Sequence, residues 1–465
     1  MNRYSGLLLA AIWALTGWAS AYAYDYPIEN KYLATVVGTP PEFRADLPEK
    51  IPLKNRRITI FEDRENSDVP DVPEALWFDA ELRYSEALQK GPAPLVFLIA
   101  GTGASYNGAK NVNMARAFYQ AGFHVVSISS PTSMNFIVAA SRSGVPGHAV
   151  EDAEDIYRVM ETIWDTLKEK IEVTDFYVTG YSLGGFNAAF VTWLDETKQT
   201  FNFKKALLIN PPVRLYDSIS LLDRMLENIP GGIDNFPQFY NRLVEQLGRV
   251  YKKSHTVNMG DDFLYKAFEA VNPDTEELAA LIGVSFRISS ANMAYTSDLM
   301  TNSGYIKPEN VTMARNASTS IFMKVSHRLG FTDFYHVYFF PYQQAKQPAL
   351  TRSELIDAMS LTSIEDYLRS AEKIEVMHNL DDIILEPGRS ISSRGSSVTV
   401  PRSIPWEDTA AIWIFATTWP TWSTYSNSRT GVLNENSIQT TSTTPLATGC
   451  GTGSRGLQHR SRDAG

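Results

Sequence analysis

The stretch that decides the fold reads FYVTGYSLGG and spans residues 176–185. Its aromatic and β-branched residues predict a strand, and residues 186–194 are typical of a helix. Between them lies a Gly-x-Ser-x-Gly turn centred on Ser182. A strand that turns into a helix here strains the backbone at the serine, and small neighbours at Gly180 and Gly184 relieve the crowding. The stretch predicts a nucleophile elbow; the alternative is a glycine-rich turn with an incidental serine.

Strand and helix patterns alternate on both sides of this turn. Continuous apolar runs predict buried strands, and three- to four-residue apolar periodicity predicts helices. The expected strands are 57–61, 76–84, 94–100, 123–129, 205–209 and 373–377, and the expected helices near them are 112–121 and 151–171. This alternation predicts an α/β fold with a mostly parallel sheet and helices on both faces.

The alternation breaks after residue 212. Residues 213–366 are predicted to be a large helical insertion, a cap or lid, with helices at 218–229, 239–251, 276–282 and 353–359. The expected organisation is a signal peptide at 1–23, the first part of the core at 24–212, the cap at 213–366, the end of the core at 367–388 and an atypical tail at 389–465.

The N-terminus predicts export. Arg3 precedes an apolar run at 7–18, and Ala21-Tyr22-Ala23 fits a signal-peptidase site. The run is shorter than the ~20 residues of a membrane span, so we expect no stable span. The single cysteine, Cys450, excludes an intrachain disulfide. We expect a periplasmic or secreted protein.

Composition excludes several function classes. The 465 residues carry a net charge of -10 without any cluster of Lys and Arg, so nucleic acid is not an expected partner. No His, Asp or Glu cluster has the spacing of a metal site, which disfavours metal-dependent hydrolysis. We expect no cofactor and no metal.

Three motifs give the chain its resemblance to a known family. They are Ala100-Gly101-Thr102-Gly103 after a buried strand, Gly180-Tyr181-Ser182-Leu183-Gly184, and His378-Asn379-Leu380-Asp381-Asp382. In this order they resemble the oxyanion loop, elbow and acid turn of the α/β-hydrolase family, although Ala100 stands where that family usually has histidine. The resemblance covers residues 90–388 without the insertion and implies the α/β-hydrolase fold.

The resemblance also implies roles for individual residues. Ser182 would attack the carbonyl of a small-molecule acyl substrate. The backbone N–H groups of Thr102 and Leu183 would stabilise the oxyanion. Asp382 would orient a catalytic histidine, and Asp381 and Asp217 remain alternatives for this acid.

The histidine of the family is missing. None of the seven histidines follows a last strand after the acid turn: they are His124, His148, His255, His327, His336, His378 and His459. Residues 389–465 lack lysine, yet hold four of the nine tryptophans, which is unusual for a disordered tail.

A frameshift near Gly388 explains this tail. Because tryptophan has one codon, the reading frame one base upstream can be partly deduced, and across 405–414 it accommodates Leu-Gly-Gly-His-Cys-Gly-Asn-Met-Asp. A Gly-Gly-His loop then follows the last strand, where the family requires it. We therefore expect an exported serine hydrolase whose activity is impaired in this chain; the alternative is a non-catalytic exported binding protein on a hydrolase scaffold.

Overall fold

The computed structural model describes residues 28–37, 45–242, 245, 274–379 and 381–385, together with short strands at 391–392, 398–399 and 403–406. The predicted signal peptide, Cys450, His255 and His459 lie outside these residues. Among the described residues, no helix combines the length and the apolar character that crossing a membrane requires.

The core is a sheet of eight strands in the order β1-β2-β4-β3-β5-β6-β7-β10. The strands from β4 through β10 in this order are parallel, whereas β1 and β2 pair antiparallel at one edge. Their bounds are β1 (Lys54–Ile58), β2 (Leu82–Ala87), β3 (Ala93–Ile99), β4 (His124–Ile128), β5 (Val173–Tyr181), β6 (Lys205–Ile209), β7 (Ile374–Asn379) and β10 (Ser403–Trp406). The predicted mostly parallel α/β fold is confirmed.

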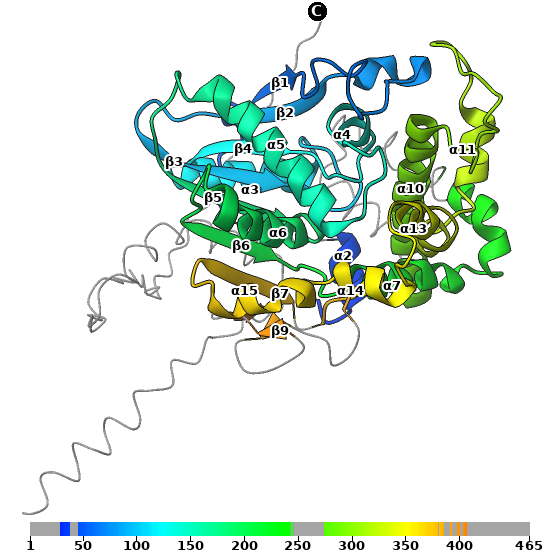
Figure 1. Cartoon of the computed structure of the whole chain (residues 1–465). Coiled ribbons are helices and arrows are strands. Elements are labelled where there is room, and N and C mark those ends of the chain that lie inside the picture. The colour runs from blue at the N-terminus through cyan, green and yellow to red at the C-terminus, as the bar shows by residue number, and fades with distance from the viewer. Residues whose placement is uncertain are drawn as a thin grey trace, which may run out of the picture. The chain divides into compact units, whose positions relative to one another are not determined.

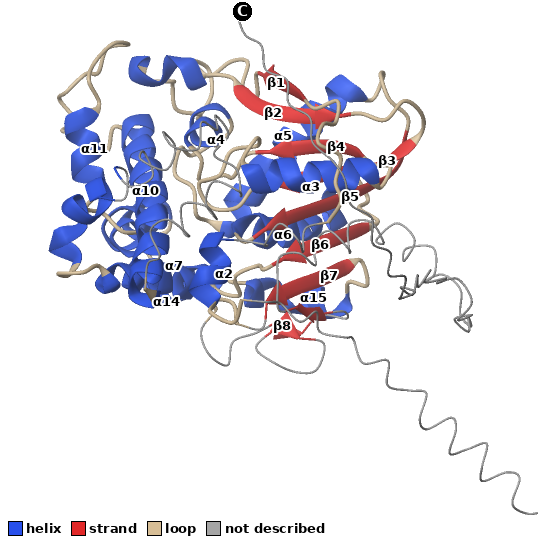
Figure 2. Ribbon diagram, turned by 180° about the vertical axis from the view of Figure 1, so that it is seen from behind, coloured by secondary structure: helices blue, strands red, loops and turns tan. Residues whose placement is uncertain are grey.

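Helices cover both faces of this sheet (Figures 1 and 2). Helix α3 (Ala109–Gln120) lies on one face, and α5 (Ala149–Leu167) and α6 (Leu183–Lys198) lie on the other. Strand β3 shows why: Leu95, Phe97 and Ile99 are buried in one apolar cluster, and Val96 and Leu98 are buried in a second. A strand with apolar side chains on both faces is stable only between two layers of helices.

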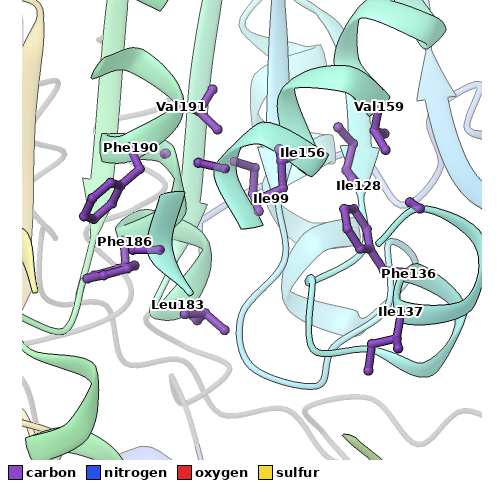
Figure 3. Close-up of a cluster of buried hydrophobic side chains, with 14 of the residues drawn as sticks. Ile99, Ile128, Phe136, Ile137, Ile156, Val159, Leu183, Phe186, Phe190 and Val191 are labelled. Carbon is purple, nitrogen blue, oxygen red and sulfur yellow. The ribbon is translucent and has the colours of Figure 1, made fainter. Parts of the chain in front are cut away.

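The larger of these two apolar clusters, which includes Leu95, Phe97 and Ile99, lies on the face of the sheet that α5 and α6 cover. Figure 3 shows Leu183, Phe186 and Phe190 of α6 beside Ile99 of β3 and Ile156 of α5. This packing fixes the start of α6 against the sheet, and so fixes the turn that precedes it.

The segment 213–366 is largely helical, as predicted, where the structure describes it. It contains α7 (Leu215–Arg224), η3 (Met225–Asn228), η4 (Ile233–Asn235), α10 (Thr275–Thr301), α11 (Ser320–Ser326), α12 (Phe331–Asp333), η5 (Phe334–Phe339, a π-helix), α13 (Phe340–Lys346), α14 (Arg352–Ala358), η6 (Leu361–Ile364) and the first two residues of α15 (Glu365–Ser370). Helices α7, α10 and α11 lie beyond the carboxyl ends of the parallel strands (Figure 2). The expected helix at 239–251 falls mostly outside the described residues.

Three local predictions were wrong or incomplete. The strand expected at 76–84 is the 3-10 helix η2 (Glu74–Asp79) followed by β2. Two short helices were not predicted, α2 (Lys31–Val37) and α4 (Met134–Ala139). The helix expected at 276–282 is the first part of the much longer α10.

Candidate active site

Ser182 occupies a one-residue turn between β5 and α6. Strand β5 ends at Tyr181 and α6 begins at Leu183, so the predicted strand–turn–helix is confirmed. The backbone of Ser182 has φ 56° and ψ −122°, a strained conformation for a residue with a side chain. Its N–H donates to the carbonyl oxygen of Ile209 at 2.8 Å, and this bond holds the turn against β6.

Two glycines make the turn possible. A Cβ added at Gly180 would lie 2.3 Å from the carbonyl carbon of Gly184. A Cβ added at Gly184 would lie 2.1 Å from the carbonyl oxygen of Ile99. Both clashes are with backbone atoms, which cannot move aside without displacing β3 or α6. The Gly-x-Ser-x-Gly pattern therefore has a steric cause here, and the reading of an incidental serine is disfavoured.

The loop after β3 reaches the elbow. A Cβ added at Gly101 would lie 3.6 Å from Cβ of Ser182 and 3.0 Å from the carbonyl oxygen of Tyr181. Neither the Thr102 nor the Leu183 N–H donates to an acceptor among the described residues. Two backbone donors without acceptors beside a strained serine are the arrangement that an oxyanion hole requires. Ala100, in the position of the family's usual histidine, is fully buried.

Hydroxyl groups hold this loop in place, a feature that the sequence analysis missed. The N–H of Gly103 donates to Oγ1 of Thr132 at 2.8 Å, and Thr132 Oγ1 also lies 2.9 Å from Oγ of Ser130. The N–H of Ser130 donates to the carbonyl oxygen of Ala104 at 3.0 Å. The Ser- and Thr-rich segment after β4 thus positions the predicted oxyanion donor.

Asp382 follows β7, the neighbour of β6 in the sheet. Its Oδ1 accepts the N–H of Ile384 at 3.1 Å, whereas its Oδ2 is buried and has no hydrogen-bond partner among the described residues. Burial raises the pKa of Asp382 to about 6, and the negative charge of Asp381 acts in the same direction. The hydrogen bond from Ile384 and the positive charges of Lys110 and Lys31 oppose this rise.

The two alternative acids have different surroundings. Asp381 is exposed. Asp217 lies in the first turn of α7, next to Ser218, whose hydroxyl donates to the carbonyl oxygen of Ile384 at 2.7 Å. Helix α7 therefore packs on the acid turn, so Asp217 remains an alternative to Asp382 as the acid.

The described histidines make no hydrogen bond to Ser182 or Asp382. His124 is buried in β4, where its Nδ1 accepts the N–H of Gln89 at 3.0 Å, and burial lowers its pKa. His148 caps α5, and Nε2 of His336 lies 2.8 Å from the hydroxyl of Tyr216. The other two are His327, at the C-cap of α11, and His378, whose Nδ1 lies 3.1 Å from the carbonyl oxygen of Asn379.

Two further elements border the elbow and could not be found in the sequence. Helix α10 touches the oxyanion loop, since a Cβ added at Gly103 would lie 2.8 Å from Cβ of Ser289. On the other side, Nζ of Lys110 lies 3.7 Å from the centre of the Tyr181 ring, a cation–π contact beside Ser182. Both contacts join residues far apart in the sequence.

The part of the chain that the structure describes contains no group of three or more His, Cys, Asp or Glu side chains that could hold a metal ion. The arrangement as a whole places Ser182, the N–H groups predicted to bind an oxyanion and the predicted acid near one end of the parallel strands, and none of the described histidines bonds to Ser182 or Asp382.

No family model and no curated protein matches the sequence. Solved structures do match. A hyperthermophilic esterase from the archaeon Pyrobaculum calidifontis shares 14% identity at a TM-score of 0.36, and the match covers 80% of this chain and 87% of the esterase. A thermostable esterase from Pseudomonas putida ECU1011 shares 16% identity at a TM-score of 0.26, with 40% and 50% covered.

Est1E from Butyrivibrio proteoclasticus shares 17% identity at a TM-score of 0.23, and the match covers 32% of this chain and 52% of Est1E, about half its length. These three solved structures are esterases. Likeness at these identities and TM-scores carries no argument about activity, so the function must be argued from the site.

Proposed function

We propose that this chain derives from an exported serine hydrolase that cleaves an ester or a similar acyl substrate. Ser182 is the nucleophile, Asp382 is the acid of the triad, and the N–H groups of Thr102 and Leu183 bind the oxyanion. The base is a histidine that the sequence of this chain lacks after the acid turn's strand, so the hydrolase activity of this chain is impaired.

The observation that carries the proposal is the unpartnered oxygen of Asp382. A buried carboxylate normally accepts hydrogen bonds through both oxygens, because an unsatisfied buried charge costs several kcal/mol. Here Oδ1 is satisfied and Oδ2 is not. In a Ser-His-Asp triad the acid accepts the Nδ1–H of the histidine, and this contact both orients the ring and stabilises its protonated form. The free Oδ2 is the acceptor that such a histidine would use.

The pairing of β10 bears on where the restored histidine would lie, if the in-frame residues form a strand at the same place in the chain. Strand β10 lies parallel to β7, with Trp406 opposite Asn379. The carboxyl ends of parallel strands meet at the same edge of a sheet, so the chain leaves β10 beside the acid turn. In the upstream frame, the first codon of Gly-Gly-His begins with the last base of the Trp406 codon. The restored histidine would therefore enter the chain at the edge of the sheet where Asp382 and Ser182 lie.

The chemistry of the proposal follows from these groups. The Ser182 oxygen attacks the carbonyl carbon of the ester while the histidine removes the serine proton. The carbonyl oxygen becomes an oxyanion, bound by the two backbone N–H groups. The histidine then gives its proton to the departing alcohol, and water releases the acid in a second, equivalent attack. Loss of one triad member costs ~10⁴–10⁶ in rate.

The first test reads the gene. The upstream frame must stay open beyond codon 388 and must encode histidine where this chain passes from Asp408 to Thr409. A stop codon, or another residue at that place, would contradict the frameshift hypothesis.

The second test uses a fluorophosphonate probe on three proteins: the chain as it is, the frame-restored protein and its Ser182→Ala variant. We expect strong labelling only of the frame-restored protein. Ser105→Ala is a matched control, since Ser105 is an exposed serine of the oxyanion loop and is not the proposed nucleophile. Absence of labelling after restoration, together with ligand binding that survives Ser182→Ala, would favour the binding-protein alternative.

A further inference from the structure

Helix α2 (Lys31–Val37) lies beside the segment 381–385, which follows β7 and carries Asp382, although the two are far apart in the sequence. Figures 1 and 2 show α2 between α7 and the carboxyl ends of β6 and β7. A helix of seven residues is not stable by itself in water, so the position of α2 depends on what it contacts.

One apolar cluster joins α2 to the segment 381–385. Its buried members come from α7, η3, α10 and the segment itself; they are Leu222, Met225, Ile282 and Ile384. Tyr32 and Val36 of α2, one helical turn apart, pack against this cluster, as do Ile383 and Leu385. The three residues that follow Asp382 are therefore held in a cluster to which α2 contributes.

The side chain of Asn30 fixes the start of α2. Its Oδ1 accepts the N–H groups of Tyr32 at 3.0 Å and of Leu33 at 3.1 Å. Its Nδ2 donates to Oγ1 of Thr275, at the start of α10, at 2.9 Å. One side chain thus caps α2 and ties it to α10, so the side of α2 that meets the cluster is specified.

Ile384 connects the cluster to Asp382. Its N–H donates to Oδ1 of Asp382 at 3.1 Å, and the N–H of Leu385 donates to the carbonyl oxygen of Asp382 at 3.3 Å. The hydroxyl of Ser218 donates to the carbonyl oxygen of Ile384 at 2.7 Å. Ile384 is therefore held by α7 through a hydrogen bond and by α2 through packing, while its own N–H holds the carboxylate.

We propose that Tyr32 and Val36 are positioning residues, which act through Ile384 to hold Asp382 in the buried orientation of a triad acid. The inference rests on the proposed role of Asp382, but it concerns the burial of this carboxylate, which can be measured without any hydrolysis. If α2 is undocked, Ile384 loses its packing on one side and water reaches the segment 381–385. The carboxylate of Asp382 is then hydrated.

The pKa of Asp382 reports this change. Burial is the largest of the causes that raise it to about 6. The charged side chains around it are Asp381 of its own turn, Lys31 of α2, Lys110 of α3 and Asp217 of α7, whereas η3 and α10 meet the segment through apolar side chains. Undocking α2 would reduce the burial and also remove the charge of Lys31, which lowers the pKa. Burial has the larger effect, so the pKa of Asp382 should fall toward 3.8.

The test measures the pKa of Asp382 in the full chain by urea unfolding at a series of pH values. The unchanged chain and each variant are paired with their Asp382→Asn counterparts, so that the difference within a pair reports Asp382 alone. We expect a pKa of about 6 in the unchanged chain and, in Tyr32→Ala, a fall toward 3.8, which is a loss of up to about 10²-fold in proton affinity. Tyr32→Phe should keep the higher value, because it keeps the ring that packs on the cluster.

Tyr240→Ala is the matched control. Tyr240 is also a partly buried tyrosine that packs on an apolar cluster, but that cluster contains no residue of α2 or of the segment 381–385. The variant should lower stability without moving the pKa of Asp382. Lys31→Met should raise this pKa slightly, in the direction opposite to Tyr32→Ala, since it removes a positive charge and leaves the packing of Tyr32 intact.

Three outcomes would overturn the proposal: a pKa near 3.8 already in the unchanged chain, a pKa of about 6 that persists in Tyr32→Ala, and an equal fall in Tyr240→Ala. If Tyr32→Ala does not fold, Val36→Thr gives the same comparison, because it keeps the shape of the side chain and places a hydroxyl in the contact; its pKa should fall by less. Failure of the probe to label Ser182 would contradict the proposed function and leave these pKa values as they are.

Discussion

Replacing Asp382 with asparagine should stabilise this chain at neutral pH, although in an intact triad the same change would remove the acid. The side chain keeps its shape and loses its charge. Burial raises the pKa of Asp382 to about 6, against 3.8 for an ordinary aspartate. At 1.36 kcal/mol for each tenfold change, this difference corresponds to up to about 3 kcal/mol of folding free energy.

The sign follows from proton binding. The folded protein binds a proton at Asp382 more tightly than the unfolded chain does, so this group favours folding most below pH 3.8. Its contribution falls as the pH rises from 3.8 to about 6 and stays low above that range. Asparagine has no such dependence. The variant should therefore match the unchanged chain near pH 4 and exceed its stability by up to about 3 kcal/mol at pH 7.

The assay is equilibrium unfolding in urea at a series of pH values, comparing Asp382→Asn with the unchanged chain. Asp381→Asn is the control; since Asp381 is exposed, its effect should remain within about 0.5 kcal/mol. Equal stability of Asp382→Asn and the unchanged chain at pH 7 would refute the claim that an unpartnered charge is buried here. In the frame-restored protein the stabilisation should largely disappear, because the histidine would supply the missing partner.

Two further variants test the geometry of the elbow. Gly184→Ala should lower the free energy of unfolding by more than about 3 kcal/mol, since its Cβ would lie 2.1 Å from the carbonyl oxygen of Ile99. Gly91→Ala is the control; a Cβ there would have nothing within 4 Å, so the free energy of unfolding should change by less than about 0.5 kcal/mol. Urea unfolding measures both values, and equal values would contradict the steric argument. Thr132→Val should cost about 1–3 kcal/mol, because the N–H of Gly103 loses its acceptor, and should also lower kcat in the frame-restored enzyme. An unchanged kcat there would show that this hydroxyl does not position the oxyanion loop.

Local patterns predicted the core because its elements depend on local chemistry. The apolar run of β3 and the periodicity of α5 report burial directly, and the turn at Ser182 depends on two glycines four residues apart, Gly180 and Gly184. The strand predicted at 76–84 failed for a physical reason: Leu76 is buried like a strand residue, but the next residues, Trp77 and Phe78, are exposed in a 3-10 helix. Apolar character alone could not distinguish the two states.

The helices of segment 213–366 were predicted only in outline because tertiary packing determines them. Helix α10 is buried on most sides, and small residues such as Ala291, Ser290 and Ser297 allow close neighbours, so no polar side marks its length. Helix α2 has seven residues and is stable only by docking, with Tyr32 and Val36 packed on the cluster that includes Ile384. Neither the full length of α10 nor the presence of α2 has a signal in its own sequence.

The missing base is the point at which sequence and structure support each other. The sequence shows that no histidine follows a last strand after the acid turn, and on this ground alone the chain could be a binding protein that never had a base. A protein without a base has no reason to bury a carboxylate oxygen without a partner, because the cost falls on folding. The buried, unpartnered Oδ2 of Asp382 is better explained as half of a contact. The other half is encoded, on our hypothesis, one base away, after the strand that pairs with β7.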